Sequence, residues 1–411
     1  MTKKQTMTGS EIIVEVLAEQ GVETIFGYSG GAILPTYDAV FQYNENHNNA
    51  MPLIVPANEQ GAGFMASGYS RATGKPGIVM VTSGPGATNT VTPVRDAMAD
   101  SIPMIVICGQ VNRSSIGSDA FQEAPITSVM GSVAKHVFLV TDENKLAATI
   151  RAAFEISTSG RPGPVVVDIP KDIQTASIDF DTGSTLNINA YRERVQSIEN
   201  NRLSDKDCER FFDCLKASSR PLIYSGGGTI AAEATEELRK FSARLKVPVT
   251  TTLMGIGAID TQSELSLQML GMHGTAFANY AVEDCDFIIA LGSRFDDRVA
   301  AVPKDFAPKA KAVAHFDIDA SEIDKVKQTD WSHVGLLKDA LNDLLNYADK
   351  KDINCDFGQW NNEIQELKAK YPLDFDRGSD LIQPQMVLDE INQLTKGEAI
   401  VSTGVGQHQM W

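Results

Sequence analysis

Glu59 is the residue whose type and surroundings point most directly to chemistry. It stands in VPANEQGAGFMASGYSRATG (55–74), after a short apolar run and at the start of a helical pattern rich in small residues. A carboxylate at a helix start is favoured by the helix dipole, and this structural role alone would explain it. A glutamate held against a ligand can also share a proton with it. The segments around Glu59 decide between these interpretations.

Three further segments in the first half have the composition of ligand-binding turns. FGYSGGA (26–32) and VTSGPGATN (81–89) each follow an apolar run and precede a helical pattern, and their glycines let a flat ligand approach the backbone. GSDAFQEAP (117–125) places Phe121 and Gln122 in a loop. VTSGPGATN is not a dinucleotide fingerprint, because Asn89 stands where the third glycine would be. Each segment alone is also compatible with an ordinary turn.

The second half carries a different set of glycine-rich and charged segments. SGGGT (225–229) is a weak nucleotide signal and is often only a turn. It is followed by TTLMGIGAID (251–260), LGMHGTA (270–276) and LGSRFDDRV (291–299). Surface loops of an α/β domain are the alternative interpretation. They do not explain why so many glycine, polar and arginine residues cluster at the ends of strands.

The elements that position these segments alternate between strand and helix. Short apolar runs at 22–26, 53–55, 77–82, 103–108 and 164–169 are separated by helical patterns near Ile33, at 59–73 and at 87–100. A capping box, Thr8 with Glu11, predicts a first helix that stops near Gly21. Near-continuous apolar strands between helices predict an α/β fold with buried parallel sheets.

The same alternation suggests two complete domains and the start of a third. We expect a first domain over 1–176, a polar linker over 177–204 and a second domain over 205–350. The second domain has predicted strands at 221–224, near Val249, at 286–291 and at 312–317, and a helix at 231–245. After a further polar connector, residues 378–411 would open a third domain with a helix at 383–394 and a strand at 399–402.

Bulk properties exclude several classes of function. The formal net charge of −17 disfavours nucleic acid and anionic membranes as partners. No apolar stretch has the length of a membrane span and the first residues lack a signal core, so we expect a cytoplasmic protein. The five cysteines are spread without a CxxC pair, which indicates reduced structural thiols.

The order of the segments in the first half resembles the pyrimidine-binding domain of thiamine-diphosphate enzymes of the pyruvate oxidase and acetohydroxyacid synthase group. The resemblance implies that Glu59 hydrogen-bonds N1′ of the aminopyrimidine and so favours the tautomer that activates the thiazolium ring. It further implies that Gln122 faces the reacting centre and that Phe121 and Lys171 lie at the substrate channel. The residues that would line the aminopyrimidine side of the cofactor are Gly30, Gly31, Thr82, Pro85 and Asn89.

The second half is similar to the flavin-binding domain of the biosynthetic, FAD-containing acetohydroxyacid synthase (acetolactate synthase) large catalytic subunit, and RFDDRV favours this group. Leu336 departs from the family, which usually has an aspartate there near the adenosine end. The implied FAD contacts are Arg161, Gly226, Gly227, Gly228, Thr252, Leu253, Leu270, Gly271, Met272, His273, Gly292, Ser293, Arg294, Asp296, Arg298, Asp317 and Ile318.

The resemblance implies decarboxylation of pyruvate and transfer of the hydroxyethyl unit to pyruvate or 2-oxobutyrate, giving 2-acetolactate or 2-aceto-2-hydroxybutyrate for branched-chain amino acids. It also implies thiamine diphosphate, Mg²⁺ and FAD as cofactors, a homodimer or larger assembly, and a small regulatory subunit. Neither nucleic acid nor membrane is expected as a partner. A pyruvate oxidase-like thiamine and flavin oxidoreductase is the nearest alternative.

The carboxyl end leaves a second alternative open. Gly406, Gln407 and His408 match diphosphate contacts of the family, but its metal-binding motif would lie beyond Trp411. We therefore expect no metal ligands within these residues, a truncated chain, and little activity from the 411 residues alone. On this interpretation the chain would be an inactive remnant of the synthase.

Overall fold

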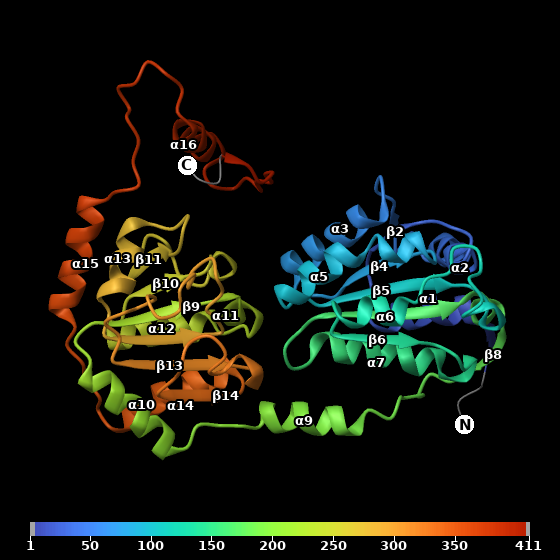
Figure 1. Ribbon diagram of the computed structural model, residues 1–411, viewed down its shortest axis with the longest axis horizontal. Helices are drawn as coiled ribbons and strands as arrows, with labels where there is room; N and C mark the ends of the chain where they lie inside the picture. Colours follow the sequence, from blue (N-terminus) through green and yellow to red (C-terminus); the bar gives the residue numbers. More distant parts are fainter. Residues whose placement is uncertain (1–4, 408–411) are drawn as a thin grey trace. The chain divides into compact units, whose positions relative to one another are not determined.

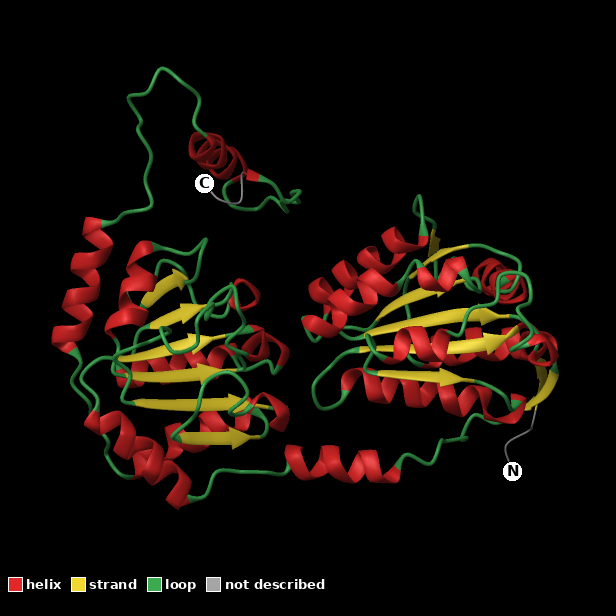
Figure 2. Ribbon diagram, viewed as in Figure 1, coloured by secondary structure: helices red, strands yellow, loops and turns green. Residues whose placement is uncertain are grey.

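A computed structural model describes residues 5–407, and the chain divides into two compact units, Met1–Ser197 and Ile198–Trp411 (Figure 1). Each unit contains one six-stranded sheet with helices packed on it (Figure 2). Every neighbouring pair of strands within these two sheets is parallel. The predicted α/β fold with buried parallel sheets is confirmed.

The sheet of the first unit has the strand order β3-β2-β4-β5-β7-β6. Its central strands are fully buried and apolar except for Gln110 in β5 and Asp168 in β7, as expected where helices cover both faces. The strands are β2 (Ile25–Tyr28), β3 (Leu53–Ile54), β4 (Gly77–Val81), β5 (Met104–Gln110), β6 (His136–Leu139) and β7 (Pro164–Pro170). The helices are α1 (Gly9–Glu19), α2 (Leu34–Asn46), α3 (Glu59–Thr73), α4 (Pro85–Thr88), α5 (Val91–Ala99), α6 (Ile126–Gly131), α7 (Leu146–Thr158) and α8 (Lys171–Thr175), with short 3-10 turns η1 (Arg113–Ser115) and η2 (Glu143–Lys145).

Helix α1 begins as the sequence predicts. The Glu11 amide donates to Thr8 Oγ1 over 3.2 Å, and the Thr8 amide donates to the Glu11 carboxylate over 2.7 Å. This capping box satisfies two amides that a helix start would otherwise leave without partners. After the helix, Gly21 turns the chain with φ +70°. The apolar face of α1, which includes Ile12 and Ile13, is buried in the core under the sheet.

Several predictions for the first unit differ from the structure. The strand predicted from Val22 begins at Ile25, and the helix predicted over 87–100 is two helices, α4 and α5. Pro93 has no amide hydrogen to donate back to the carbonyl of Asn89, so one continuous helix is disfavoured there. Strand β6 has no counterpart in the sequence analysis.

The segment interpreted as a linker, 177–204, contains regular structure. Strand β8 (Ser177–Phe180) pairs antiparallel with β1 (Gln5–Thr8), so it belongs to the first unit. Helix α9 (Asn189–Glu199) follows, and the boundary between the two units falls within it. Polar composition hid both elements, because each buries only one face.

The sheet of the second unit has the order β11-β10-β9-β12-β13-β14. The predicted helix at 231–245 is interrupted at Glu233, whose φ of +50° is not helical. The strands are β9 (Pro221–Ser225), β10 (Val249–Thr251), β11 (Ser266–Met269), β12 (Phe287–Leu291), β13 (Ala312–Asp317) and β14 (Trp331–Val334). The helices are α10 (Asp205–Ala217), α11 (Gly227–Ala231), α12 (Thr235–Leu245), α13 (Ala276–Asp284), α14 (Leu337–Lys350) and α15 (Gly358–Lys370), with 3-10 turns η3 (Leu253–Gly255) and η4 (Ala320–Glu322).

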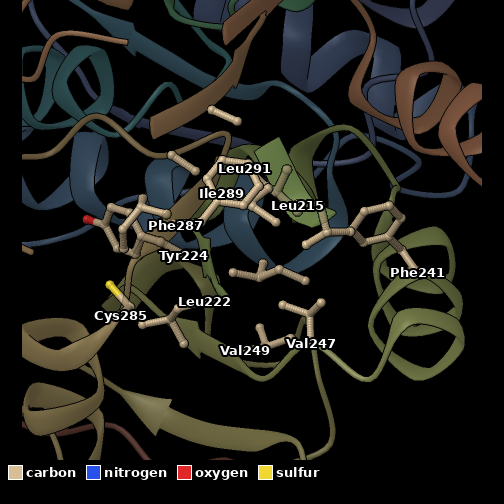
Figure 3. Close-up of a cluster of buried hydrophobic side chains, with 14 of the residues drawn as sticks. Leu215, Leu222, Tyr224, Phe241, Val247, Val249, Cys285, Phe287, Ile289 and Leu291 are labelled. Carbon is tan, nitrogen blue, oxygen red and sulfur yellow. The ribbon is translucent and has the colours of Figure 1, made fainter. Parts of the chain in front are cut away.

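One hydrophobic core holds the second unit together. Side chains of α10, α12 and the central strands meet in it, as Figure 3 shows for Leu215, Phe241, Leu222, Phe287 and Leu291. Burial of such a set of large apolar side chains is the main stabilising contribution to an α/β unit.

The polar segment after 350 also contributes to this core. Helix α15 buries Trp360 and Ile364, and Trp360 Nε1 donates to the carbonyl of Pro221 over 3.1 Å. The segment is therefore not only a connector. Helix α16 (Pro384–Thr395) forms close to its predicted position. The strand predicted at 399–402 is absent from the described residues, because no neighbouring strand there supplies the hydrogen bonds that a strand requires.

Candidate functional site

The predicted site segments of the first unit all lie at one edge of its sheet. Parallel strands end at the same edge, so the turns after β2, β4 and β5 are neighbours in space. These turns are FGYSGGA, VTSGPGATN and the 111–125 loop. Lys171 opens α8 directly after β7, and it is half-buried. Edges of this kind are where open parallel sheets bind ligands.

Glu59 is held at this edge by its helix and by one side chain. Asn58 caps α3, its Oδ1 accepting from the Gly61 amide over 2.8 Å, so Glu59 is the first helical residue. Asn89 Nδ2 donates to Glu59 Oε2 over 2.9 Å. Within residues 5–407, Glu59 Oε1 has no hydrogen-bond partner. The half-buried carboxylate is therefore oriented through one oxygen and can accept a ligand hydrogen bond with the other.

Thr82 forms the floor beside Glu59. Its Oγ1 accepts from the Ala32 amide over 3.1 Å, which ties FGYSGGA to the end of β4. A Cβ added at Gly30 would lie 2.4 Å from Thr82 Cγ2, and one added at Gly86 would lie 2.6 Å from the same atom. Both glycines therefore pack directly on Thr82, and this contact fixes the two turns beside Glu59. The remaining predicted residues, Gly31 and Pro85, are exposed at the same edge.

The loop after β5 places its two predicted residues differently from one another. Phe121 is 88% exposed. Gln122 has a left-handed φ of +57°, and its carbonyl lies where a Cβ on Gly84 would come within 2.4 Å. The backbone of Gln122 is thus pressed against the VTSGPGATN turn that also carries Asn89.

Two side chains of the first unit were missed by the sequence analysis. Gln174 is buried, and its Nε2 donates to the carbonyls of Ala32 over 2.8 Å and Ile169 over 3.0 Å. Tyr37 Oη donates to the Met80 carbonyl over 2.9 Å, and its pKa is raised by burial and by the charge of Glu59. Neither residue lies in a glycine-rich turn. Gln174 follows the end of β7 by four residues, whereas Tyr37 lies inside α2, where no local signal marks it.

The second unit presents a comparable edge built mainly from backbone. The amide of Gly228 donates to the Gly292 carbonyl over 3.1 Å, and the amide of Thr252 donates to the Ser225 carbonyl over 2.9 Å. Gly292 has φ +53°, and a Cβ on it would lie 2.6 Å from Gly228 Cα. The turns after β9, β10 and β12 are therefore in direct contact.

The LGMHGTA turn joins the same edge. A Cβ on Gly271 would lie 3.1 Å from the Arg298 carbonyl, which places this turn beside RFDDRV. Asn279 clamps it, accepting from the Gly271 amide over 2.9 Å and donating to the Gly271 carbonyl over 3.0 Å. The sequence analysis missed Asn279. Met272 and Leu253 are 68% and 70% exposed, and they offer apolar surface at the edge.

The other residues predicted to contact FAD lie in several different segments of the chain. Asp317 ends β13, and its Oδ1 accepts from the Asp319 amide over 2.9 Å. Arg298 donates its amide to Asp296 Oδ1 over 3.0 Å. Arg161 belongs to the first unit, where its Nε donates to Ser101 Oγ over 2.9 Å. The remaining members lie in the turns already described or beside them: Gly226, Gly227, Leu270, His273, Ser293, Arg294 and Ile318.

Leu336, the residue that departs from the resembled pattern, is the N-cap of α14. It makes no side-chain cap hydrogen bond. An aspartate at an N-cap normally accepts from an amide in the first turn. The substitution therefore leaves the start of α14 without a cap at the edge that carries Asp317.

The carboxyl-terminal predictions are not assembled into a site. Gly406 and Gln407 are exposed in a segment that lacks a strand or a complete helix, and His408 lies outside the described residues. Among residues 5–407, no group of three or more His, Cys, Asp or Glu side chains could hold a metal ion. No helix in that range is long and apolar enough to cross a membrane.

Comparison with known proteins gives two matches to protein families. Residues 7–131 match the family described as "Thiamine pyrophosphate enzyme, N-terminal TPP binding domain". Residues 208–344 match "Thiamine pyrophosphate enzyme, central domain". The matched ranges contain the two sheet edges described above, apart from Lys171 and Gln174.

Three similar curated proteins carry the acetolactate synthase name. The chain is 44% identical over 405 residues to acetolactate synthase 2, chloroplastic, of Nicotiana tabacum, covering 98% of the chain and 59% of that relative. It is 44% identical over 409 residues to acetolactate synthase, chloroplastic, of Arabidopsis thaliana, with coverage of 99% and 59%. The mitochondrial acetolactate synthase catalytic subunit of Saccharomyces cerevisiae is 42% identical over 421 residues, with 98% and 60% covered.

The chain therefore spans about 60% of the length of these relatives. The resemblance inferred from the ordered turns of the sequence agrees with both family matches and with the shared name of the relatives. By homology across nearly all of its residues, this chain belongs to the acetolactate synthase family of thiamine pyrophosphate enzymes.

Proposed function

We propose that the polypeptide that carries this chain is an acetolactate synthase. It would decarboxylate pyruvate on thiamine diphosphate and join the two-carbon unit to pyruvate, giving 2-acetolactate, or to 2-oxobutyrate, giving 2-aceto-2-hydroxybutyrate. The observation that carries the proposal is Glu59, oriented by Asn89 through Oε2 and open at Oε1, beside the floor formed by Thr82. Family membership supplies the reaction type.

The residues of the first unit account for the protein's part in activation. When bound, thiamine diphosphate supplies a carbanion at C2 of its thiazolium ring. Glu59 would hold a proton between Oε1 and the aminopyrimidine nitrogen N1′, and Asn89 would keep the carboxylate pointing at that nitrogen. Gly30, Gly31 and Thr82 would line the aminopyrimidine side of the cofactor, and Pro85 would bound it. Gln122 would face the reacting centre, with Phe121 and Lys171 at the substrate channel.

We assign the second edge to FAD. Backbone amides and glycines there suit a pyrophosphate, and the Arg294 and Arg298 guanidinium groups add charge of the matching sign. On this assignment 1–176 is the pyrimidine-binding domain, 205–350 the central FAD-binding domain, and 378–411 the start of a pyrophosphate-binding domain that would hold Mg²⁺. Gly406, Gln407 and His408 would then contact the diphosphate. We also include Arg161 among the proposed FAD contacts, as the resemblance implies.

We further propose a homodimer or larger assembly with a small regulatory subunit, as the family resemblance implies. The yeast relative is named a catalytic subunit, which supports a separate partner subunit. We also propose a cytoplasmic location. The names of the relatives above place those proteins in chloroplasts and mitochondria.

Product analysis tests the function. The protein expressed from its complete gene is incubated with pyruvate, thiamine diphosphate, Mg²⁺ and FAD, and the product is identified by mass spectrometry. We expect 2-acetolactate, and a mixture with 2-aceto-2-hydroxybutyrate when 2-oxobutyrate is added. Acetyl phosphate or hydrogen peroxide as the main product would instead support a pyruvate oxidase-like oxidoreductase. Absence of turnover would support the inactive remnant.

A further inference from the structure

A buried carboxyl group in β7 has no part in the function proposed so far. Asp168 is only 1% exposed and lies opposite Cys108 of β5. Its Oδ2 accepts from Gln110 Nε2 over 2.9 Å, and its Oδ1 has no hydrogen-bond partner in the described part of the chain. Burial of an acidic group with one oxygen unsatisfied opposes folding. An apolar side chain would serve the core better, so the carboxyl group calls for another explanation.

Gln110 connects this carboxyl group to the loop after β5. Its Nε2 donates one hydrogen to Asp168 Oδ2 and the other to the carbonyl of Ala124 over 3.1 Å. Its Oε1 accepts from the Val111 amide over 2.9 Å. Both amide hydrogens and the amide oxygen are used, so the three partners together fix the orientation of the Gln110 side chain. Ala124 is thereby tied to the strand below it.

Ala124 lies two residues after Gln122, whose conformation needs such support. Gln122 has φ +57°, which is uncommon for a residue with a side chain and persists where neighbours impose it. On one side the Glu123 amide donates to the Ala120 carbonyl over 2.9 Å, and the Glu123 carboxylate accepts from the Ala120 amide over 3.0 Å. Beneath the loop lies Gly84, where a Cβ would meet the Gln122 carbonyl at 2.4 Å. The Ala124 carbonyl accepts from the Ile126 amide over 2.8 Å within the loop, and Gln110 adds the hydrogen bond that joins this carbonyl to β5.

We propose that Asp168, acting through Gln110, is a positioning residue that holds the Ala124 carbonyl and thereby fixes Gln122 at the reacting edge of the first unit. The functional consequence rests on the proposed function, because only there does Gln122 face reacting groups. The positioning itself does not depend on it. Asp168 would retain an unfavourable burial because its oxygen sets the direction of the Gln110 amide.

The test uses three variants of the complete protein. Gln110→Leu removes both donors but leaves Asp168 without a partner, so it can fail to fold. The double variant Gln110→Leu/Asp168→Leu removes the pair together, and replacing both partners with apolar groups of similar size is tolerated far better. Asp168→Asn keeps an oxygen that accepts from Gln110, and it serves as the conservative rescue.

Ser157→Ala is the matched control. Ser157 is fully buried, accepts from the Met104 amide over 3.1 Å and donates to the Gly163 carbonyl over 2.8 Å. Met104 begins β5, so these hydrogen bonds lie at the opposite end of the strand from Gln110. The control therefore weakens the same sheet without touching the loop.

The first measurement is amide hydrogen exchange of residues 117–125. Loss of one hydrogen bond in a partly buried loop corresponds to about tenfold faster exchange. We expect this increase in the double variant, while Asp168→Asn and Ser157→Ala leave the loop unchanged. Unchanged exchange in the double variant, or an equal increase in Ser157→Ala, would overturn the positioning role. Neither result depends on catalysis.

The second measurement separates kcat from cofactor binding. In the double variant we expect kcat for acetolactate formation to fall at least tenfold, with thiamine diphosphate affinity within about twofold of wild type, because Glu59 and Thr82 are untouched. The thermal midpoint should be equal or higher, so a loss of kcat cannot be attributed to unfolding. A wild-type kcat in a variant with a mobile loop would contradict the link to Gln122. If the wild-type protein makes no acetolactate, the proposed function fails, and the exchange result alone decides the positioning role.

Discussion

The two sheet edges are built in different ways from the same kind of fold. In the first unit buried side chains hold the turns: Gln174 binds Ala32, and Gln110 joins Asp168 to Ala124. In the second unit the turns after β9, β10 and β12 meet main chain to main chain, as where Gly228 donates to Gly292, and the Asn279 side chain holds the LGMHGTA turn. Side-chain ties fix individual groups in direction, whereas backbone contacts make a continuous wall. The first arrangement suits catalysis at one atom, and the second suits a large ligand that is only held.

The largest expected effect follows from removing the single directed acid of the first edge. Glu59→Gln keeps the size of the side chain and the contact with Asn89 but cannot share a proton with a ring nitrogen. We expect kcat for acetolactate formation to fall by about 10²- to 10⁴-fold, the usual contribution of a positioned acid or base. Steady-state kinetics with saturating cofactors measure it.

Glu11→Gln is the control for that prediction. Glu11 also stands in the first turn of a helix of the same unit, where it completes the capping box with Thr8. Its replacement should leave kcat within about twofold and change only stability, by roughly 1 kcal/mol. A Glu59→Gln enzyme of near wild-type activity would show that the first edge does not act through a directed acid.

The second prediction concerns the dependence of stability on pH. Burial raises the pKa of Asp168 to about 7. Burial also raises the pKa of the Cys108 thiol, which lies opposite Asp168, well above its usual value, so this thiol stays neutral. Below about pH 4 the acid is protonated in the folded and unfolded states alike. Between about pH 4 and 7 only the folded state keeps the proton, so the free energy of unfolding falls as pH rises, by at most about 4 kcal/mol.

Asp168→Asn should therefore raise the thermal midpoint at pH 8 and change it little at pH 4, as calorimetry would show. Asp286 of the second unit gives the opposite case. Burial opposes its ionisation, but hydrogen bonds from Ser218, Ser219 and Arg220 outweigh that effect and lower its pKa. Asp286→Asn should cost stability at neutral pH and progressively less below about pH 4. If the thermal midpoints of the two variants, each compared with wild type, changed with pH in the same direction, the two buried acids would not differ in this way.

The third prediction tests the backbone wall of the second unit. Gly292→Ala adds a methyl group within 2.6 Å of Gly228 Cα at a residue with φ +53°. We expect a loss of about 2–4 kcal/mol in the unfolding free energy of this unit and loss of bound flavin, measured by calorimetry and flavin absorbance. Gly131→Ala adds the same group where nothing lies within 4 Å, and it should leave both unchanged. Normal flavin binding by Gly292→Ala would show that the wall is not required.

The smallest expected effect comes from adding one side-chain hydrogen bond at the second edge. Leu336→Asp places an acceptor at the N-cap of α14, which has no side-chain cap. We expect a gain of about 0.5–2 kcal/mol in stability and a modest gain in FAD affinity. Leu336→Asn, an uncharged cap, separates the capping effect from charge near Asp317. Weaker flavin binding in Leu336→Asp would place the adenosine end elsewhere.

The sequence predicted those features that depend on local chemistry. These are the capping box of α1, the buried strands and the glycine turns at strand ends. Each depends on residues only a few positions apart, so it can be recognised in the sequence. Asn279, Gln174 and the Asp168 pair were not, because each acts through a partner distant in sequence or through backbone. Helix α15 was missed because its sequence is mostly polar, and few of its side chains, Trp360 and Ile364 among them, reach the core. Glu59 was found because the glycine-rich segments around it can be recognised by both their composition and their order in the sequence.

The pairing of β1 with β8 has a consequence for synthesis of the chain. Thr6 and Asp179, which are hydrogen-bonded, are 173 positions apart, so the first strand leaves the ribosome long before its partner exists. At typical rates of elongation this delay is roughly 10–35 s. During that interval the amino-terminal strand is a bare edge available to other chains. Slower translation through the α7–β7 region should therefore increase aggregation of the nascent protein, and a chaperone that binds extended segments should relieve it.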